Sequence, residues 1–183
     1  ARVAYYLGDY TAYYQDRMNL NPLSHLDPLG TLALYFLGFG WAKPVPVSMR
    51  NLSNPRKDMM LIAIAGPASN IFLATIGSIL LRFSAVAPFN IPELLNSAMI
   101  FFVFINIVLA LFNLIPIAPL DGSRILPLFI RDPRTLYQIE YYGPRVLMGL
   151  VLLSLVGGLS IFSIIIFEPA KLIFNLLTGI NLV

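Results

Sequence analysis

The chain has 183 residues, of which 58% are hydrophobic and only 11% are charged, whereas a soluble domain of this size normally has about 25% charged residues. This composition excludes an ordinary water-soluble globule and favours a lipid bilayer as the solvent. The net charge of +3 is too small and too scattered for a nucleic-acid-binding protein, and the lack of cysteine excludes disulfides and thiolate metal ligands, so a metal here would need His or carboxylate ligands.

The first region, residues 1–58, contains no long apolar span. Residues 1–7 are predicted to be the last turns of a helix, with Gly8 as its C-terminal stop. Residues 11–20 are rich in tyrosine with interleaved polar residues, a pattern compatible with a strand. The chain begins without Met or a charged leader, so we expect it to be truncated at this end; a processed N-terminus is the alternative.

A shorter apolar stretch at residues 31–42 is too short to span a membrane and predicts a re-entrant or interfacial element. Residues 43–47 read KPVPV, in which the prolines lack backbone donors and the alternating valines favour an extended strand or loop. His25, the only histidine, precedes this stretch in a polar turn, where a structural role is the simpler interpretation.

Three segments are free of charge and long enough to be transmembrane helices. They are residues 59–81, residues 94–115 within a longer uncharged stretch, and residues 146–167. A spanning helix needs about 20 residues. In lipid the backbone polar groups must be satisfied within the segment, so each is expected to be helical.

Basic residues gather in residues 43–58 and again in residues 121–145, which the positive-inside rule places on the cytoplasmic side. The predicted fold class is an all-α polytopic membrane protein, one domain over residues 1–183. It would have about three full transmembrane helices, the end of an N-terminal helix and a small β or re-entrant hairpin element. The tail, residues 168–183, has no assigned role, although it could lie on a membrane surface.

The end of the second span carries the sequence NLIPIAPLDG, residues 113–122. Pro116 and Pro119 are expected to break the helix, and unwound backbone at membrane depth is tolerated only where it is buried in protein or lines a cavity. Asp121 follows this break. A carboxylate near the membrane indicates a functional residue, but Asp-Gly-Ser also fits an ordinary helix N-cap.

The first span contains GPASN at residues 66–70, where Pro67 is expected to kink the helix. The amide of Asn70 has two interpretations. It could make an interhelical polar contact, or it could hold a substrate backbone or an oxyanion.

These blocks, in this order, resemble the short, bacterial-type branch of the site-2 protease family, peptidase M50. The resemblance covers residues 1 to about 130. Single blocks are weak signals, but several in sequence are specific. The matching blocks are LGDYTA (7–12), LNPLSHLDPLGT (20–31), GWAKPVPV (40–47), AGPASN (65–70) and the NLIPIAPLDG stretch.

The resemblance implies that Asp121 is the third ligand of a catalytic Zn²⁺. It further implies that Asn70 lies near the scissile peptide and that Asn113 stabilises the unwound segment or contacts substrate. The family's other ligands and its general base come from an HExxH helix, which the resemblance places just before Ala1 and which the 183 residues lack. These 183 residues are therefore expected to be an inactive piece of a zinc-dependent endopeptidase that holds zinc weakly.

The complete protease would cleave transmembrane protein substrates within the bilayer of a prokaryotic cell membrane. Two other classes remain open. A non-catalytic pseudoprotease that grips substrate helices would have this N-terminus intact and no metal. A small transporter or channel subunit is disfavoured, because the spans contain no internal charge and the unwound segment is single.

Overall fold

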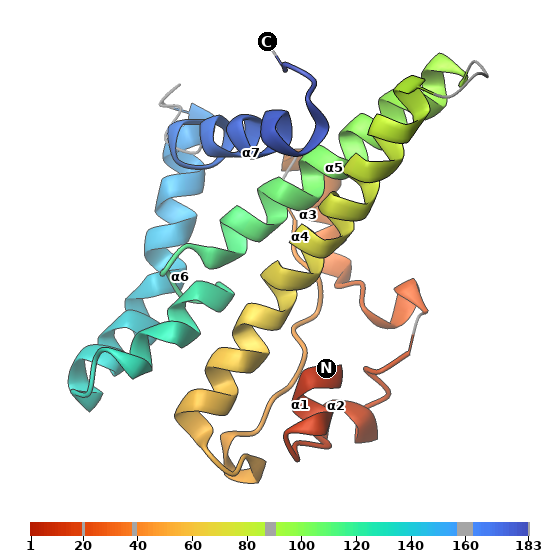
Figure 1. Ribbon diagram of the computed structural model, residues 1–183. Helices are drawn as coiled ribbons and strands as arrows, with labels where there is room; N and C mark the ends of the chain where they lie inside the picture. The colour runs from red at the N-terminus through yellow and green to blue at the C-terminus, as the bar shows by residue number, and fades with distance from the viewer. Residues whose placement is uncertain (20, 38–39, 87–90, 157–162, 183) are drawn as a thin grey trace. The chain divides into compact units, whose positions relative to one another are not determined.

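The computed structural model describes residues 1–19, 21–37, 40–86, 91–156 and 163–182 (Figure 1). The chain is mostly helical, and its described residues contain no β-strand. It divides into two compact units, residues 1–62 and residues 63–183, each held by its own internal contacts. The mostly helical fold class is therefore confirmed.

The first unit begins with two short helices, α1 (Arg2–Tyr6) and α2 (Thr11–Tyr14). Gly8 has a φ of +98°, so the predicted helix stop at this residue is confirmed. The strand predicted for residues 11–20 is wrong, because residues 11–14 are helical. The cause is local: the Asp9 carboxylate accepts a hydrogen bond from the backbone N–H of Thr11, which starts a helical turn.

Asp9 also connects the start of the chain to the 3-10 turn η2 (Met49–Asn51). Its side chain is only 1% exposed. The carboxylate accepts hydrogen bonds from the Thr11 hydroxyl at 2.5 Å, the Ser48 N–H at 2.8 Å and the Asn51 amide at 2.9 Å. Burial raises the pKa of Asp9, but these hydrogen bonds together lower it below its usual value.

The helix α3 (Pro28–Leu37) follows the turn η1 (Pro22–Ser24). Its Gly30 lies directly against the backbone of Trp41, where a side chain at residue 30 would collide with the Trp41 carbonyl. The predicted re-entrant or interfacial stretch is thus helical through Leu37, and residues 38–39 lie outside the described residues.

Residues 40–48, which follow α3 after the undescribed residues 38–39, form no helix. One isolated antiparallel bridge joins Leu26 to Ala42, and the Lys43 N–H donates a hydrogen bond to the His25 carbonyl at 2.9 Å. Within the described parts of this region, no pair of strands forms, so the predicted hairpin is not confirmed.

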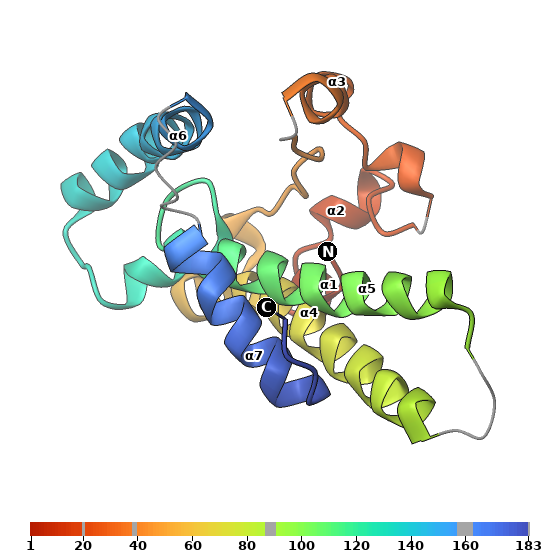
Figure 2. The same cartoon turned by 90° about the horizontal axis from the view of Figure 1, so that it is seen from above.

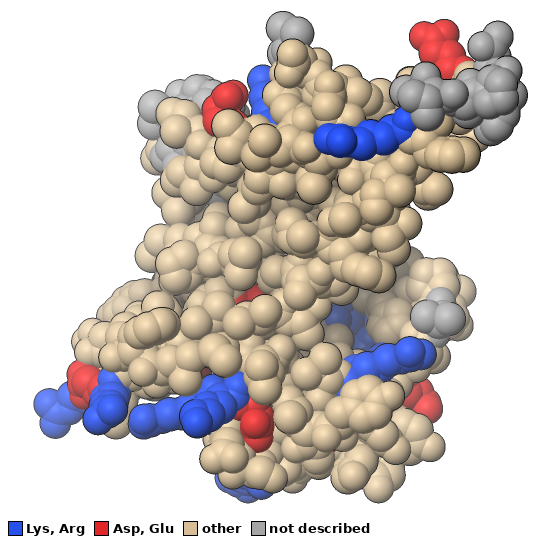
Figure 3. Space-filling model, in the orientation of Figure 1, with Lys and Arg blue, Asp and Glu red and all other residues tan. Residues whose placement is uncertain are grey.

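Two helices are long and apolar enough to cross a membrane. They are α4 (Pro55–Val86), which continues through Pro67, and α5 (Glu93–Leu114). In each, only 22% of the most apolar 18-residue window is buried in the protein, unlike the core helix of a soluble domain. Most of the visible face is uncharged (Figure 3). The predicted spans 59–81 and 94–115 coincide with these two helices.

The third predicted span, residues 146–167, is not confirmed. Helix α6 (Pro133–Val156) begins well before it, because Asp132 accepts hydrogen bonds from the N–H groups of Arg134 and Thr135 and starts the helix there. Residues 157–162 lie outside the described residues. A π-helical turn (Ser163–Phe167) and then α7 (Glu168–Thr178) complete the chain.

The core of the second unit lies where α7 packs on α5. Figures 1 and 2 show α7 lying across α5. Phe174 of α7 is fully buried, and its ring meets the Phe104 ring of α5 edge to face. The buried residues of this core are Ala74, Leu81, Val103, Ile107, Ala170 and Phe174. One face of α7 therefore packs on protein rather than on a membrane surface, while its Leu172 and Leu176 are exposed.

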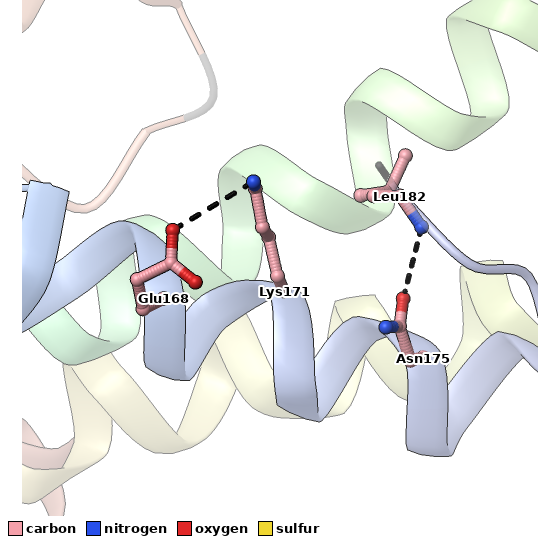
Figure 4. A network of polar contacts seen from close by, with 4 residues as sticks. All are labelled: Glu168, Lys171, Asn175 and Leu182. Atoms are coloured by element: carbon pink, nitrogen blue, oxygen red, sulfur yellow. Dashed lines mark hydrogen bonds and ion pairs between the residues drawn. The ribbon is translucent and has the colours of Figure 1, made fainter.

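The far end of α7 is closed by polar contacts. Gly179 ends the helix with a φ of +74°, and Arg82 of α4 donates hydrogen bonds to the carbonyls of Leu176 and Leu177. Figure 4 shows the Asn175 amide oxygen accepting a hydrogen bond from the Leu182 N–H at this end. It also shows the ion pair between Glu168 and Lys171 at the start of α7.

Candidate functional site

The candidate site is the loop after α5, residues 115–120, together with the Asp121 that follows it. α5 ends at Leu114, so the helix break predicted from the two prolines is confirmed. The loop then turns tightly: the N–H of Ile117 donates to the Ile115 carbonyl at 2.8 Å, and the N–H of Leu120 donates to the Ile117 carbonyl at 2.9 Å. The peptide bond before Pro119 is cis.

Asp121 is the first residue of the 3-10 helix η3 (Asp121–Leu128), and its side chain is partly buried. The N-cap position belongs to Leu120, and no side chain caps this helix. The N-cap interpretation of Asp121 is therefore wrong. Among the described residues, no hydrogen bond reaches the Asp121 carboxylate, so both of its oxygens keep their acceptor capacity.

The Asp121 carboxylate lies beside α4. Its Oδ2 atom is 3.0 Å from the position that a Cβ on Gly66 would occupy. The structure thus brings the aspartate of the LDG block against the glycine of the GPASN block. Burial raises the pKa of Asp121, and the positive charge of Arg124 opposes this shift.

Two further glycines hold the loop in place. A Cβ on Gly122 would lie 2.5 Å from the carbonyl carbon of Leu114, and one on Gly143 of α6 would lie 2.6 Å from the Ala118 Cβ. Both distances are far shorter than van der Waals contact. The loop is therefore packed tightly against the end of α5 and against α6.

Asn70 lies one turn after Gly66 on α4, and residues four apart share a helix face. Because Gly66 contacts Asp121, Asn70 lies on the side of α4 that carries this contact. Its amide is partly buried and makes no hydrogen bond within the described residues, so the predicted interhelical contact is not seen. The Asn113 amide instead donates to the Leu109 carbonyl of its own helix at 3.0 Å.

Sequence reasoning missed a third amide, Asn106, in the middle of α5. It is 6% exposed and donates to the Phe102 carbonyl at 2.8 Å. Asn106 and Asn113 lie seven residues apart, which places both on one face of α5. The sequence did indicate this residue, because a hydrogen-bonding amide side chain within an uncharged span is a candidate functional group.

One carboxylate does not make a zinc site. A catalytic Zn²⁺ normally has three protein ligands and a water, and the described residues contain no group of three or more His, Asp or Glu side chains that could hold a metal. Asp121 fits one ligand position, because it is partly buried and free of hydrogen bonds. The remaining ligand positions are not filled by the described residues. The Nε2 atom of His25 lies 3.0 Å from the Asn19 carbonyl oxygen in the first unit.

Comparison with known proteins gives consistent matches. The model of peptidase family M50 matches residues 93–155, which include α5, the loop and η3. The chain is 44% identical over 153 residues to "Putative zinc metalloprotease YwhC" of Bacillus subtilis, an alignment that covers 78% of this chain and 68% of the relative. It is 37% identical over 70 residues to "Putative zinc metalloprotease Rip3" of Mycobacterium tuberculosis, covering 38% of this chain and 17% of that protein. No solved structure matches.

Proposed function

Because the chain belongs to peptidase family M50, and so to a family of metalloproteases, we propose that it forms part of a zinc-dependent intramembrane endopeptidase in which Asp121 is one zinc ligand. The observation that carries the proposal is the placement of Asp121. Its carboxylate follows the break at the end of an apolar helix, lies against Gly66 and caps no helix.

The remaining parts of the site have proposed roles in holding substrate. The amide of Asn70 has free donors on the side of α4 that faces Asp121, so it can bind the carbonyl of a peptide. The loop also exposes Pro116 and Pro119, whose carbonyls accept no hydrogen bond within the described residues. A substrate helix must unwind before its peptide bonds can be reached, and such groups could bind the exposed backbone.

The proposed substrates are transmembrane segments of other proteins, and the proposed location is a prokaryotic cell membrane crossed more than once. Two apolar helices support a membrane location. The 183 residues contain no HExxH sequence, so the other zinc ligands and the general base of a family mechanism would have to come from elsewhere in the protein.

The test has two steps. The coding sequence upstream of Ala1 is read for an HExxH motif, and the full-length protein is then made with Asp121→Asn or with the control Asp132→Asn. The control changes an exposed carboxylate, and asparagine can still cap α6. Bound zinc is measured by atomic emission, and activity by cleavage of a transmembrane reporter.

We expect Asp121→Asn to lose zinc and cleavage, and Asp132→Asn to keep both. Normal zinc content and cleavage in Asp121→Asn would refute the role of Asp121. An upstream reading frame without HExxH, combined with no bound zinc, would support the non-catalytic pseudoprotease instead.

A further inference from the structure

Gly143 lies inside α6, where an exposed glycine would cost about 1 kcal/mol relative to alanine. It is buried, and the reason for a glycine here is a close approach between backbones. A Cβ at residue 143 would lie 2.6 Å from the Ala118 Cβ, 2.7 Å from the Ala118 carbonyl oxygen and 2.9 Å from its nitrogen. Two of these three atoms belong to the main chain and cannot move without moving the loop.

Ala118 is at the centre of the loop that ends at Asp121, and it is only 5% exposed. The other end of the loop is equally restricted, because a Cβ on Gly122 would lie 2.6 Å from the Ile115 carbonyl oxygen. Because both ends of the loop are tightly packed, the loop has no free residues that could compensate for a displacement of Ala118. Such a displacement would be transmitted through Pro119 and Leu120 to Asp121.

The Asp121 side chain lies against α4, where the Asp121 Oδ2 atom contacts Gly66. We propose that Gly143 of α6 is a positioning residue for Asp121. Because Gly143 has no side chain, α6 can pack directly against Ala118. This packing fixes the loop in the position that places the Asp121 carboxylate beside Gly66. The functional value of this placement rests on the proposed role of Asp121 as a zinc ligand. The placement itself does not depend on any metal.

The experiment measures the position of residue 121 directly by disulfide formation. The chain has no native cysteine, so any disulfide within it comes from an introduced pair. Gly66→Cys and Asp121→Cys form the reporting pair. Gly77→Cys and Val103→Cys form a reference pair, because a Cβ on Gly77 would lie 2.7 Å from Val103 Cγ2 at the contact between α4 and α5.

Each pair is placed in the full chain in membranes, with Gly143→Ala or with the matched control Gly149→Ala. Gly149 lies on the same helix and has no atom within 4 Å of an added Cβ. The rate of disulfide formation under a fixed oxidant is compared among these backgrounds. We expect Gly143→Ala to slow the 66–121 pair roughly tenfold, as an overpacked site shifts its backbone, while the 77–103 pair keeps its rate.

Gly149→Ala is expected to leave both pairs unchanged. An unchanged 66–121 rate in Gly143→Ala would overturn the inference, and so would a 66–121 pair that does not form in the parent chain. Equal slowing of both pairs would show general loosening of the fold and would also overturn it. Since this readout contains no zinc and no Asp121, its failure leaves the proposed protease function standing, while a failure of the zinc measurement leaves this inference standing.

Discussion

The carboxylate of Asp121 occupies the space that a side chain on Gly66 would need: its Oδ2 atom is 3.0 Å from the Cβ position of residue 66. The two residues come from separate sequence blocks, one at the loop after α5 and one inside α4. Any side chain at residue 66 would have to displace the carboxylate by a few tenths of an ångström. Glycine at this position thus leaves room for the proposed zinc ligand beside α4.

The first prediction is that Gly66→Ala weakens zinc binding by the full-length protein. Displacing the surroundings of a metal ligand typically lowers affinity by about 10- to 100-fold, and we expect a loss near the lower limit because only one methyl group is added. Competition with a chromophoric chelator measures the affinity. Gly149→Ala is the control, since its added Cβ meets no atom within 4 Å. Equal zinc affinity in the two variants would contradict the prediction.

The second prediction concerns Asp9, whose buried carboxylate connects Thr11, Ser48 and Asn51. Asp9→Asn replaces the charged carboxylate by an amide, whose NH2 group would compete with the acceptor oxygen for the position opposite the Asn51 NH2 group. Hydrogen bonds to charged groups are each worth about 1.5–3 kcal/mol, so we expect a loss of about 3 kcal/mol in the free energy of unfolding at neutral pH. Thermal unfolding in detergent, compared with Asp16→Asn at an exposed position, is the measurement.

The stabilisation by Asp9 should also depend on pH, with a sign set by its pKa. The hydrogen bonds hold the folded-state pKa below its usual value of 3.8. A lowered folded pKa gives stability that is present above the unfolded-state pKa and is lost as pH falls through the folded-state pKa. The difference between wild type and Asp9→Asn should therefore be constant at neutral pH and shrink below about pH 4. A difference that grows on acidification would be inconsistent with this sign.

The third prediction is that Phe174→Ala destabilises the second unit far more than Phe101→Ala. Phe174 is fully buried between α7 and α5, whereas Phe101 of α5 is 65% exposed. A buried Phe→Ala change costs about 3–5 kcal/mol in soluble cores, and we expect the lower end because lipid is as apolar as the core. Chemical unfolding in mixed micelles measures both variants. Similar losses for both would mean that α7 does not pack on α5.

The fourth prediction uses two glycines with opposite expected effects. Gly179 ends α7 with a φ of +74°, and the atom nearest to an added Cβ, a guanidinium nitrogen of Arg82, is 3.9 Å away, so alanine meets backbone strain but no collision. We expect Gly179→Ala to cost about 1–2 kcal/mol. Gly149 is exposed inside α6, so Gly149→Ala should gain up to about 1 kcal/mol. Melting temperatures that move in the same direction for both would disprove this.

Patterns of apolar residues, proline and glycine in the sequence predicted where helices form and where they end. The absence of charge over residues 59–81 and 94–115 predicted the two long helices, because length and apolarity are sufficient for a helix in lipid. Pro116 and Pro119 predicted the end of α5. Gly8 predicted the end of α1, since its positive φ favours glycine.

Two kinds of feature were not predictable from these patterns: helices that a neighbouring aspartate side chain starts, and contacts between residues far apart in sequence. The tyrosine-rich residues 11–14 gave a strand pattern, yet Asp9 turns them into a helix. Asp132 starts α6 ahead of the apolar segment, and residues 157–162 lie outside the described residues, so the third predicted span is not confirmed. The approach of Gly66 to Asp121, and that of Gly143 to Ala118, joins residues far apart in sequence. The roles of Asp121, Asn70 and Asn113 remain predictions.

The packing of α7 on α5 has a practical consequence for handling the protein. Variants that stop before Glu168 would uncover the face of α5 that carries Phe104, whose ring meets that of Phe174 in the intact chain. Such variants would expose an apolar surface that binds chaperones and detergent. Because the Leu182 N–H donates a hydrogen bond to the Asn175 amide oxygen, a purification tag fused directly after residue 182 needs a flexible spacer to preserve this contact.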